Sequence, residues 1–353
     1  MTASVLVVGT GLIGTSVGLA LHDRRRVLLT DSAADRLDVA VGRGAGERWD
    51  GAEPADLVLL AVPPSVVAPE LRRLMERGAG RAYTHVASIQ SHVQREIDAT
   101  GVDTSLVCGG HPLAGRETAG PGAATAELFL GRPWVLCPSE RTGAAAADAV
   151  RALATDCGAE PLELSPAEHD RTVALVSHLP QVAASAVAAR LLTGPPGAAD
   201  VSGPGLQDTT RVAASDPSLW VEVLLGNRGY VAPLVRELAG DLDRLAAALE
   251  SGADGAVRDL LERGSRGRAL VPVKRGEHDR DFTSVAVSVP DAPGQLAGLF
   301  VTAADAGVNV EDVRVEHLRG RPSGVIELVV QPGDRQRLQT ALATAGFAVL
   351  RAD

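Results

Sequence analysis

The sequence predicts a chain of three parts: an α/β nucleotide-binding domain, an all-helical domain and a small βαββαβ unit. Short buried strands alternate with helical segments up to residue 164, broad Ala/Leu/Val stripes follow, and alternating strands return near the end. A chain of 353 residues is also too long for one ordinary core. We therefore expect domains at 1–164, 165–272 and 280–353.

The composition is that of an ordinary globular protein, with 45% hydrophobic and 22% charged residues. A formal net charge of -10 argues against a general binder of nucleic acid or anionic membranes. No basic leader precedes the first apolar run, and we expect no run of membrane-spanning length. These features predict a cytoplasmic protein with neither a nucleic acid nor a membrane as partner.

Three cysteines form an odd, sparse set without a CxxC pair, which favours a reducing compartment over a disulfide framework. Cys108 and His111 have CxxH spacing, but no second pair completes a zinc site. We therefore expect no metal.

The first domain opens with an apolar run, Ser4–Val8, followed by Gly9-Thr-Gly-Leu-Ile-Gly14 and an apolar-periodic segment. This is the strand, turn and helix that a dinucleotide-binding fingerprint requires. Gly9 permits the tight turn, Gly11 lets a pyrophosphate approach the backbone, and Gly14 lets helix and strand pack closely. The pattern predicts a Rossmann-type domain; the alternative is a structural glycine turn.

A second strand, Arg26–Thr30, ends in Asp31, whose carboxylate is placed to bind the adenosine ribose and to repel a 2′-phosphate. No arginine follows at once, so NAD is favoured over NADP. A later buried strand must end at Pro63, because proline cannot donate to a strand ladder, and it borders the nicotinamide side. The predicted cofactor-binding residues are Gly9, Gly11, Leu12, Ile13, Gly14, Asp31, Val62 and Pro63.

A strand at Ala82–Ala87 delivers Ser88, and the apolar run from Leu106 to Cys108 ends in two glycines followed by His111. In a parallel, doubly wound sheet, a histidine beyond a strand end points into the ligand crevice. The alternative is a capped turn whose histidine satisfies a backbone group. Trp134–Cys137 and Pro161–Leu164 read as late strands of the same sheet.

The helical domain begins with a capping box, Ser165-Pro-Ala-Glu168, and a long helix to about Leu192. Pro180 lies inside that helix, so a kink is expected beside His178. Asp216-Pro217, Ala232–Leu249 and Gly255–Arg263 predict further helices, which pack on one another within or between subunits.

A polar, basic link over Arg263–Arg280 leads to the last unit. Its strands and helices follow the order βαββαβ, which is the ferredoxin-like pattern. The strands are predicted at Phe282–Val289, Val308–Leu318, Val325–Gln331 and Ala348–Arg351, and the helices at Gln295–Ala306 and Asp334–Ala345.

Several segments, in this order, resemble the prephenate/arogenate dehydrogenase family of tyrosine biosynthesis over roughly residues 1–270. The last unit resembles an ACT domain, which commonly binds amino acids at a domain interface. The first resemblance rests on Gly9–Ser16, Gly110–Glu117, Ser177–Pro180, Asp208–Arg211, Ser215–Pro217 and Trp220, and the second on Asp291–Gly294 and Gly307–Asn309.

The resemblance implies NAD-dependent oxidative decarboxylation of prephenate to 4-hydroxyphenylpyruvate. The apolar stripes of the helical block predict a homodimer formed through it. The resemblance makes His111 the general base for the substrate hydroxyl, a role that suits a neutral imidazole, and Ser88 a hydrogen-bond partner both of that hydroxyl and of the base. Arg211 binds a substrate carboxylate through its bidentate fork. His178 lies in the substrate pocket and Glu117 at its mouth. Without the resemblance, His178 reads as a core histidine and Arg211 as a surface arginine.

Four positions depart from the family pattern: His85 stands for an aspartate, Gln90 for a lysine, Gln181 for a histidine and Gln207 for an arginine. They leave open whether the substrate is prephenate, arogenate or an amino-deoxyprephenate-type analogue. A non-catalytic sensor of NAD and an amino acid is a further alternative.

The ACT-like unit predicts feedback by an amino acid, tyrosine above all, near Asp291, Gly294 and Asn309. A unit kept only for assembly is the alternative.

Overall fold

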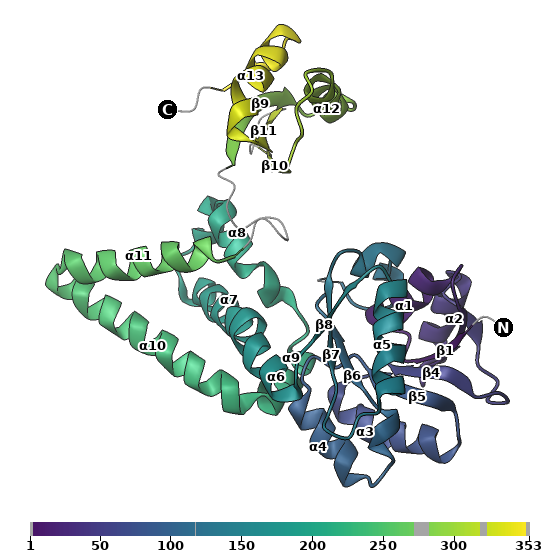
Figure 1. Cartoon of the computed structure of the whole chain (residues 1–353). Helices are drawn as coiled ribbons and strands as arrows, with labels where there is room; N and C mark the ends of the chain where they lie inside the picture. The colour runs from purple at the N-terminus through teal and green to yellow at the C-terminus, as the bar shows by residue number, and fades with distance from the viewer. Residues whose placement is uncertain (1–2, 117, 272–281, 318–322, 351–353) are drawn as a thin grey trace. The chain divides into compact units, whose positions relative to one another are not determined.

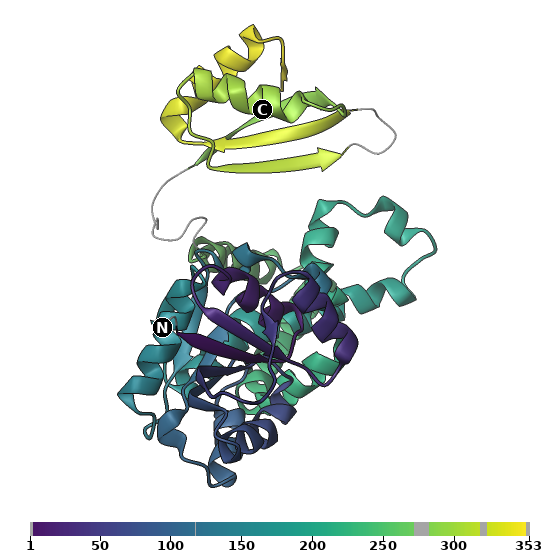
Figure 2. The same ribbon diagram turned by 90° about the vertical axis from the view of Figure 1, so that its right-hand side faces the viewer.

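The computed structural model describes residues 3–116, 118–271, 282–317 and 323–350, and Glu117 therefore lies outside the described residues. The chain divides into two compact units, Met1–Arg244 and Leu245–Asp353. Figures 1 and 2 show the elements of both.

A five-stranded parallel sheet forms the start of the first unit, as the sequence predicts, with strand order β3-β2-β1-β4-β5. Val5 and Val7 of β1 pack into one buried cluster, whereas Leu6 and Val8 pack into another on the opposite face. Both faces are therefore covered, which is typical of a doubly wound sheet. Its elements are β1 (Ser4–Val8), α1 (Leu12–Leu21), β2 (Arg26–Thr30), α2 (Ala34–Gly42), β3 (Glu47–Arg48), β4 (Ala55–Leu60), α3 (Pro64–Glu76), β5 (Gly80–His85) and α4 (Ser91–Ala99).

A separate three-stranded sheet follows, in the order β6-β7-β8, with β6 and β7 antiparallel. The prediction of one continuous parallel sheet was wrong here. Val107 makes only an isolated bridge to Tyr83, and His111 lies inside β6 rather than beyond a strand end. The elements are η1 (Thr104–Leu106), β6 (Gly109–Pro112), η2 (Pro121–Ala123), η3 (Ala126–Phe129), β7 (Pro133–Cys137), α5 (Ala144–Asp156) and β8 (Glu160–Glu163).

Because Gly109 has no side chain, strand β6 can run past the side chain of Gln90. A Cβ atom on Gly109 would lie 2.3 Å from Oε1 of Gln90. Strand residues with side chains would collide there, so a glycine that looks like a strand terminator is instead what lets β6 form.

The helical part begins with the predicted capping box: the Ser165 hydroxyl accepts from the Glu168 N–H at 3.3 Å, and the Glu168 carboxylate accepts from the Ser165 N–H at 3.0 Å. Where a kink was predicted beside His178, the structure has a π turn that ends at His178, two residues before Pro180. The elements are α6 (Pro166–Val173), the π turn η4 (Ala174–His178), α7 (Leu179–Arg190), η5 (Leu191–Thr193), η6 (Ala198–Val201), α8 (Pro204–Thr210), η7 (Arg211–Ala214), α9 (Pro217–Gly226) and α10 (Arg228–Ser251).

The helical run Pro166–Thr193 is long and apolar enough to cross a membrane by length and composition, contrary to the expectation that no run is. His169 and Asp170 in its first turns and His178 in its middle are buried inside the protein. Ionisable side chains of this kind are costly in a bilayer, and their partners are other protein groups. The run therefore carries ionisable groups that are buried against other parts of this unit, although only 28% of its apolar window is buried.

The second unit contains the end of α10, α11 (Asp254–Ala269) and a four-stranded antiparallel sheet in the order β10-β11-β9-β12. Residues 263–269 belong to α11, so the predicted link begins later than expected. Leu299, Leu338 and Leu342 of the two helices pack with strand residues such as Val287 in one buried cluster. The chain order βαββαβ is confirmed: β9 (Thr283–Pro290), α12 (Gln295–Asp305), β10 (Asp312–His317), β11 (Ser323–Val330), η8 (Pro332–Asp334), α13 (Arg335–Thr344) and β12 (Ala348–Val349).

Candidate active site

The glycine turn between β1 and α1 has the shape of a phosphate cradle. A Cβ on Gly9, which has φ +96°, would lie 2.4 Å from the Ala61 carbonyl oxygen, and one on Gly14 would lie 1.9 Å from the Gly9 carbonyl oxygen. A Cβ on Gly11, the N-cap of α1, would meet nothing within 4 Å. The protein itself requires the first and last glycines, whereas Gly11 leaves open space before a helix N-terminus, where an anion binds well.

Asp31 at the end of β2 is bound to the same turn. Its carboxylate accepts from the Thr10 N–H at 2.6 Å, the Thr10 hydroxyl at 2.8 Å and the Ala33 N–H at 2.8 Å. Burial acts to raise the pKa of Asp31, but these donors and the charge of Arg36 hold the pKa below its usual value. A charged carboxylate thus stands beside the cradle, where the ribose of a dinucleotide binds.

The remaining predicted cofactor residues flank the turn. Cγ1 of Val62 lies 3.0 Å from the position of a Cβ on Gly9, and the exposed Pro63 is the N-cap of α3. Leu12 and Ile13 form the first turn of α1 and pack against the core. The residues present fit a dinucleotide at this end of the sheet.

A chain of hydrogen bonds begins at the partly exposed His111 of β6 and runs into the protein. Nδ1 of His111 lies 2.8 Å from Nε2 of His169, and Nδ1 of His169 lies 2.9 Å from Oδ1 of Asp170. The two histidine rings meet edge to face, with centroids 5.0 Å apart. His169 and Asp170 lie in α6 and are 0% and 1% exposed, so the inner members of the chain are shielded from water.

Asp170 also fastens α6 to the start of α4. Its Oδ1 accepts from the Gln90 N–H at 2.7 Å, and its Oδ2 accepts from the Ser91 N–H at 2.8 Å. Burial acts to raise the pKa of Asp170, but the hydrogen bonds from His169, Gln90 and Ser91 hold it below its usual value. A buried carboxylate thereby stays charged.

His178 at the end of the π turn is the second histidine of the site and is buried. Its Nδ1 lies 3.1 Å from Nδ2 of Asn227, which also donates to the Asp170 carbonyl oxygen at 2.8 Å. Trp220 of α9 meets its ring edge to face at 5.8 Å. Segments around residues 111, 170, 178 and 227 therefore converge on one place.

The histidine rings are kept neutral. Burial, followed by the neighbouring His169 and His178, lowers the pKa of His111 well below 6.5. Burial is also the largest cause that lowers the pKa of His85 and of His178 to about 4. At neutral pH these rings carry no charge, and a neutral imidazole can accept a proton.

Two of the departures from the family pattern lie beside His111. Nδ1 of the buried His85, at the end of β5, accepts from the Ala87 N–H at 3.3 Å. The Gln90 side chain donates to the carbonyl oxygens of Ala87 at 2.7 Å and Gly110 at 3.2 Å. Gln90 therefore fastens the loop that carries Ser88 to the strand that carries His111.

The other two departures lie on the helices. Gln181 is buried near the start of α7, with Nε2 3.5 Å from the Ser185 hydroxyl, whereas Gln207 is exposed on α8. Neither takes part in the hydrogen bonds described around His111.

Ser88 and Arg211, the two remaining predicted substrate contacts, lie in different surroundings. Ser88 is partly exposed in the loop between β5 and α4, and within the described residues its hydroxyl makes no hydrogen bond. Arg211 is exposed at the start of η7, a turn that packs on α7. It takes no part in the described hydrogen bonds that join His111, His169 and Asp170. Gln90 thus holds the loop of Ser88 beside the strand that carries His111, whereas Arg211 lies outside the hydrogen bonds that join His111, His169 and Asp170.

His169 and Asp170 were not among the predicted site residues. The available signal was an adjacent histidine and aspartate directly after a capping box, at the start of an otherwise apolar helix. Such a polar pair on an apolar helix needs a buried partner. The partner, His111, is 58 residues away in sequence, so only the fold reveals the pair's role.

In the part of the chain that the structure describes, no group of three or more His, Cys, Asp or Glu residues is arranged to hold a metal ion. The three cysteines are free and buried. Burial raises the pKa of the Cys108 and Cys157 thiols to about 12, which leaves them unreactive.

Comparison with known proteins agrees with this architecture. Residues 17–162 match the nucleotide-binding domain of prephenate dehydrogenase, and residues 165–263 match its dimerization domain. The chain is 36% identical to the probable prephenate dehydrogenase NovF of Streptomyces niveus, over 95% of this chain and 96% of that protein. It is 25% identical to the prephenate dehydrogenase of Bacillus subtilis, over 100% and 99% of the two chains.

Among solved structures, prephenate dehydrogenase from A. aeolicus in complex with hydroxyphenyl propionate and NAD+ has a similar fold. The TM-score is 0.69 at 24% identity, and the match covers 76% of this chain and 98% of that one.

Proposed function

The chain belongs to the prephenate dehydrogenase family of NAD-dependent oxidoreductases, and we propose that it converts prephenate to 4-hydroxyphenylpyruvate. The observation that carries the proposal is His111: a neutral, partly exposed imidazole with one nitrogen engaged by a buried histidine. Such a group is a suitable base for a substrate hydroxyl.

In the proposed reaction, each proton and electron pair has a donor and an acceptor. Nε2 of His111 takes the proton of the ring hydroxyl, so an O–H bond breaks and an N–H bond forms. NAD supplies the acceptor for the hydride that leaves the same ring carbon. The bond to the ring carboxylate then breaks, CO₂ departs, and its electron pair completes the aromatic ring. The new phenolate oxygen recovers the proton from His111.

The remaining roles are proposals supported by position. Ser88 lies on the loop that Gln90 fastens to β6, and it would donate to or accept from the substrate hydroxyl. His178 would contact the substrate from the helical side, and Arg211 would bind a carboxylate. Glu117 remains a predicted rim residue outside the described residues. A cytoplasmic location also remains a prediction.

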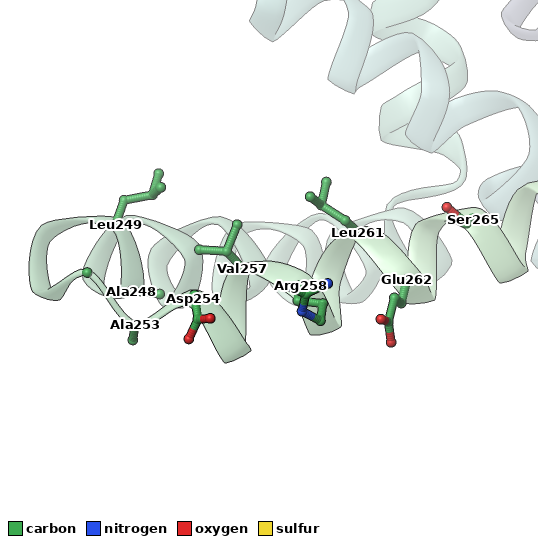
Figure 3. Close-up of a pocket in the computed structure, with 10 residues that line it drawn as sticks. Ala248, Leu249, Ala253, Asp254, Val257, Arg258, Leu261, Glu262 and Ser265 are labelled. Carbon is green, nitrogen blue, oxygen red and sulfur yellow. The ribbon is translucent and has the colours of Figure 1, made fainter.

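A homodimer is supported by the match of residues 165–263 to a dimerization domain. In the second unit, the end of α10 and α11 line a groove of about 560 Å³, and Figure 3 shows Leu249, Val257 and Leu261 along it. Leu249 and Leu261 are 63% and 65% exposed and line the same groove, and contiguous exposed apolar surface marks an interaction site. Leu261→Arg should therefore shift the mass measured by light scattering toward the monomer, whereas Val39→Arg on α2 should not.

The C-terminal sheet unit is proposed to be ACT-like and to bind an amino acid, with tyrosine first. Its element order and its sheet order, β10-β11-β9-β12, support a ferredoxin-like fold. Asp291 and Gly294 lie between β9 and α12, and Asn309 lies just before β10. Calorimetry with tyrosine tests the proposal, and absence of binding would leave the unit with an assembly role only.

One experiment separates the candidate functions: NADH formation from prephenate and arogenate side by side, with and without tyrosine. A higher kcat/KM for prephenate is the expected result. Preference for arogenate would keep the chemistry and change the substrate. Intact NAD binding without NADH from either compound, or from an amino-deoxyprephenate-type analogue, would favour a non-catalytic sensor.

A further inference from the structure

We propose that His169 and Asp170 are positioning residues that fix the ring and the tautomer of His111, so that its Nε2 lone pair faces the substrate. The inference rests on the proposed role of His111 as base. It adds two residues that act through neighbouring histidines rather than by contact with substrate or cofactor.

The tautomer of His111 follows from the donors and acceptors in the hydrogen bonds that join Asp170, His169 and His111. The Asp170 carboxylate only accepts, so Nδ1 of His169 must donate across the 2.9 Å contact. If His169 has a single N–H, that N–H faces Asp170, and Nε2 of His169 therefore accepts. Nδ1 of His111 must then donate across the 2.8 Å contact. With both rings neutral, the proton of His111 is on Nδ1 and its Nε2 carries the free lone pair.

Asp170 is held rigidly enough to impose this order. Two backbone N–H groups, from Gln90 and Ser91, bind separate oxygens of its carboxylate at 2.7 and 2.8 Å. The carboxylate therefore cannot rotate away without leaving buried donors unpaired, which is costly. Since these donors start α4 and Asp170 lies in α6, the packing of two segments sets the state of the base.

The backbone carbonyl of Asp170 acts through Asn227 on His178, and it places the proton of His178 on the other ring nitrogen, Nε2. Asn227 Nδ2 has two N–H groups, one for that carbonyl at 2.8 Å and one for Nδ1 of His178 at 3.1 Å. Nδ1 of His178 therefore accepts, and its proton is on Nε2. Asp170 thus arranges an acceptor on His111 and a donor on His178.

Asp170 also affects how easily His111 is protonated. The titratable groups that act on His111 are His169 and Asp170 of α6, His178 of the π turn and His85 of β5. Burial and the three histidines lower the pKa of His111, and Asp170 alone raises it. Removing the carboxylate charge should lower that pKa further, and the acid limb of kcat/KM should move to lower pH.

The test compares His169→Phe with His169→Gln. Phenylalanine leaves Nδ1–H of His111 without an acceptor, so the ring can take the wrong tautomer; in the Ser-His-Asp triad such an error costs about 10⁴ in kcat. The oxygen of glutamine can reach the place of Nε2 and accept the same proton. We expect kcat to fall by about 10²–10⁴ in the Phe variant and within about tenfold in the Gln variant.

Asp170→Asn provides the pH readout, because it removes the charge at nearly constant shape. Its acid limb should lie at lower pH than that of the wild-type enzyme. If kcat falls equally in both His169 variants, and the acid limb of the kcat/KM profile of Asp170→Asn lies at the wild-type pH, the two residues are merely structural and the proposal is wrong.

Nitrogen-15 NMR of the histidine rings gives a readout that needs no turnover. The wild-type protein should show His111 protonated on Nδ1, and His169→Phe should lose that preference. A wild-type His111 protonated on Nε2 overturns the proposal that His169 and Asp170 fix its tautomer. If the wild-type protein has the expected tautomer yet forms no NADH from prephenate or arogenate, the proposed function fails, but the proposed role of His169 and Asp170 stands.

Discussion

The histidine cluster and the segment that carries Arg211 were predicted to serve one site, yet they are built differently. His111 is held through His169 and Asp170 by contacts among buried groups. Arg211 is exposed on η7, after the α8 segment that projects from the body of its unit in Figure 2. The difference teaches that the proposed base is preorganised by buried contacts within one chain, whereas the arginine proposed to bind a carboxylate lies outside the hydrogen bonds that join His111, His169 and Asp170. Substitutions should therefore separate kcat from KM.

His111→Asn should have the largest effect. Asparagine can still hydrogen-bond but accepts no proton at neutral pH, so kcat should fall by about 10²–10⁴. Steady-state kinetics with prephenate, together with NAD affinity from fluorescence, measure the split, and the KM for prephenate should change little. An enzyme within a few-fold of wild-type kcat would remove His111 from the role of base.

Arg211→Leu should act mainly on KM. A charge-assisted hydrogen bond contributes about 1.5–3 kcal/mol, so KM for prephenate should rise roughly 10- to 150-fold. The matched control is Arg190→Leu, which removes another exposed arginine from the same helical part. If the two variants bind prephenate equally well, Arg211 has no part in the site; if kcat falls instead of KM rising, the contrast between the regions is wrong.

Gly11→Ala sharpens the comparison on the cofactor side. Its new Cβ meets no protein atom, so the free energy of unfolding should stay near the wild-type value. Overpacking against a bound pyrophosphate costs about 1–3 kcal/mol, so the Kd for NAD should rise roughly 5- to 150-fold. Gly14→Ala is the control, because its Cβ would lie 1.9 Å from a carbonyl oxygen and should lower stability itself. Unchanged NAD affinity in folded Gly11→Ala would mean that nothing binds in that space.

Local patterns were enough for much of the fold. The bounds of β1 and β2, the capping box at Ser165 and the βαββαβ order of the last unit depend on periodicity, caps and turns between neighbours in sequence. The second sheet was not predictable in this way. Whether Gly109 ends a strand or lets one pass depends on Gln90, which lies 19 residues earlier and fills the missing Cβ position.

The site shows the same division. His111 and the glycine turn stand out because their types and spacing are unusual, whereas His169 and Asp170 gain their role only by contact with a distant strand. The sequence singles out the histidine that we propose as the base, whereas nothing in it singles out Asp170, which we propose decides which nitrogen accepts the proton.

The smallest expected effect is in the pH profile of the wild-type enzyme. His111 acts as a base only when neutral, so kcat/KM falls as pH drops through its pKa in the free enzyme. An unperturbed histidine would be half protonated at pH 6.5 and would halve the rate there. Burial lowers the pKa of His111 well below 6.5, so kcat/KM should change little between pH 8 and pH 6.5 and fall only at lower pH. A midpoint at or above 6.5 would show that burial does not lower the pKa of His111 and that the predicted pH profile is wrong.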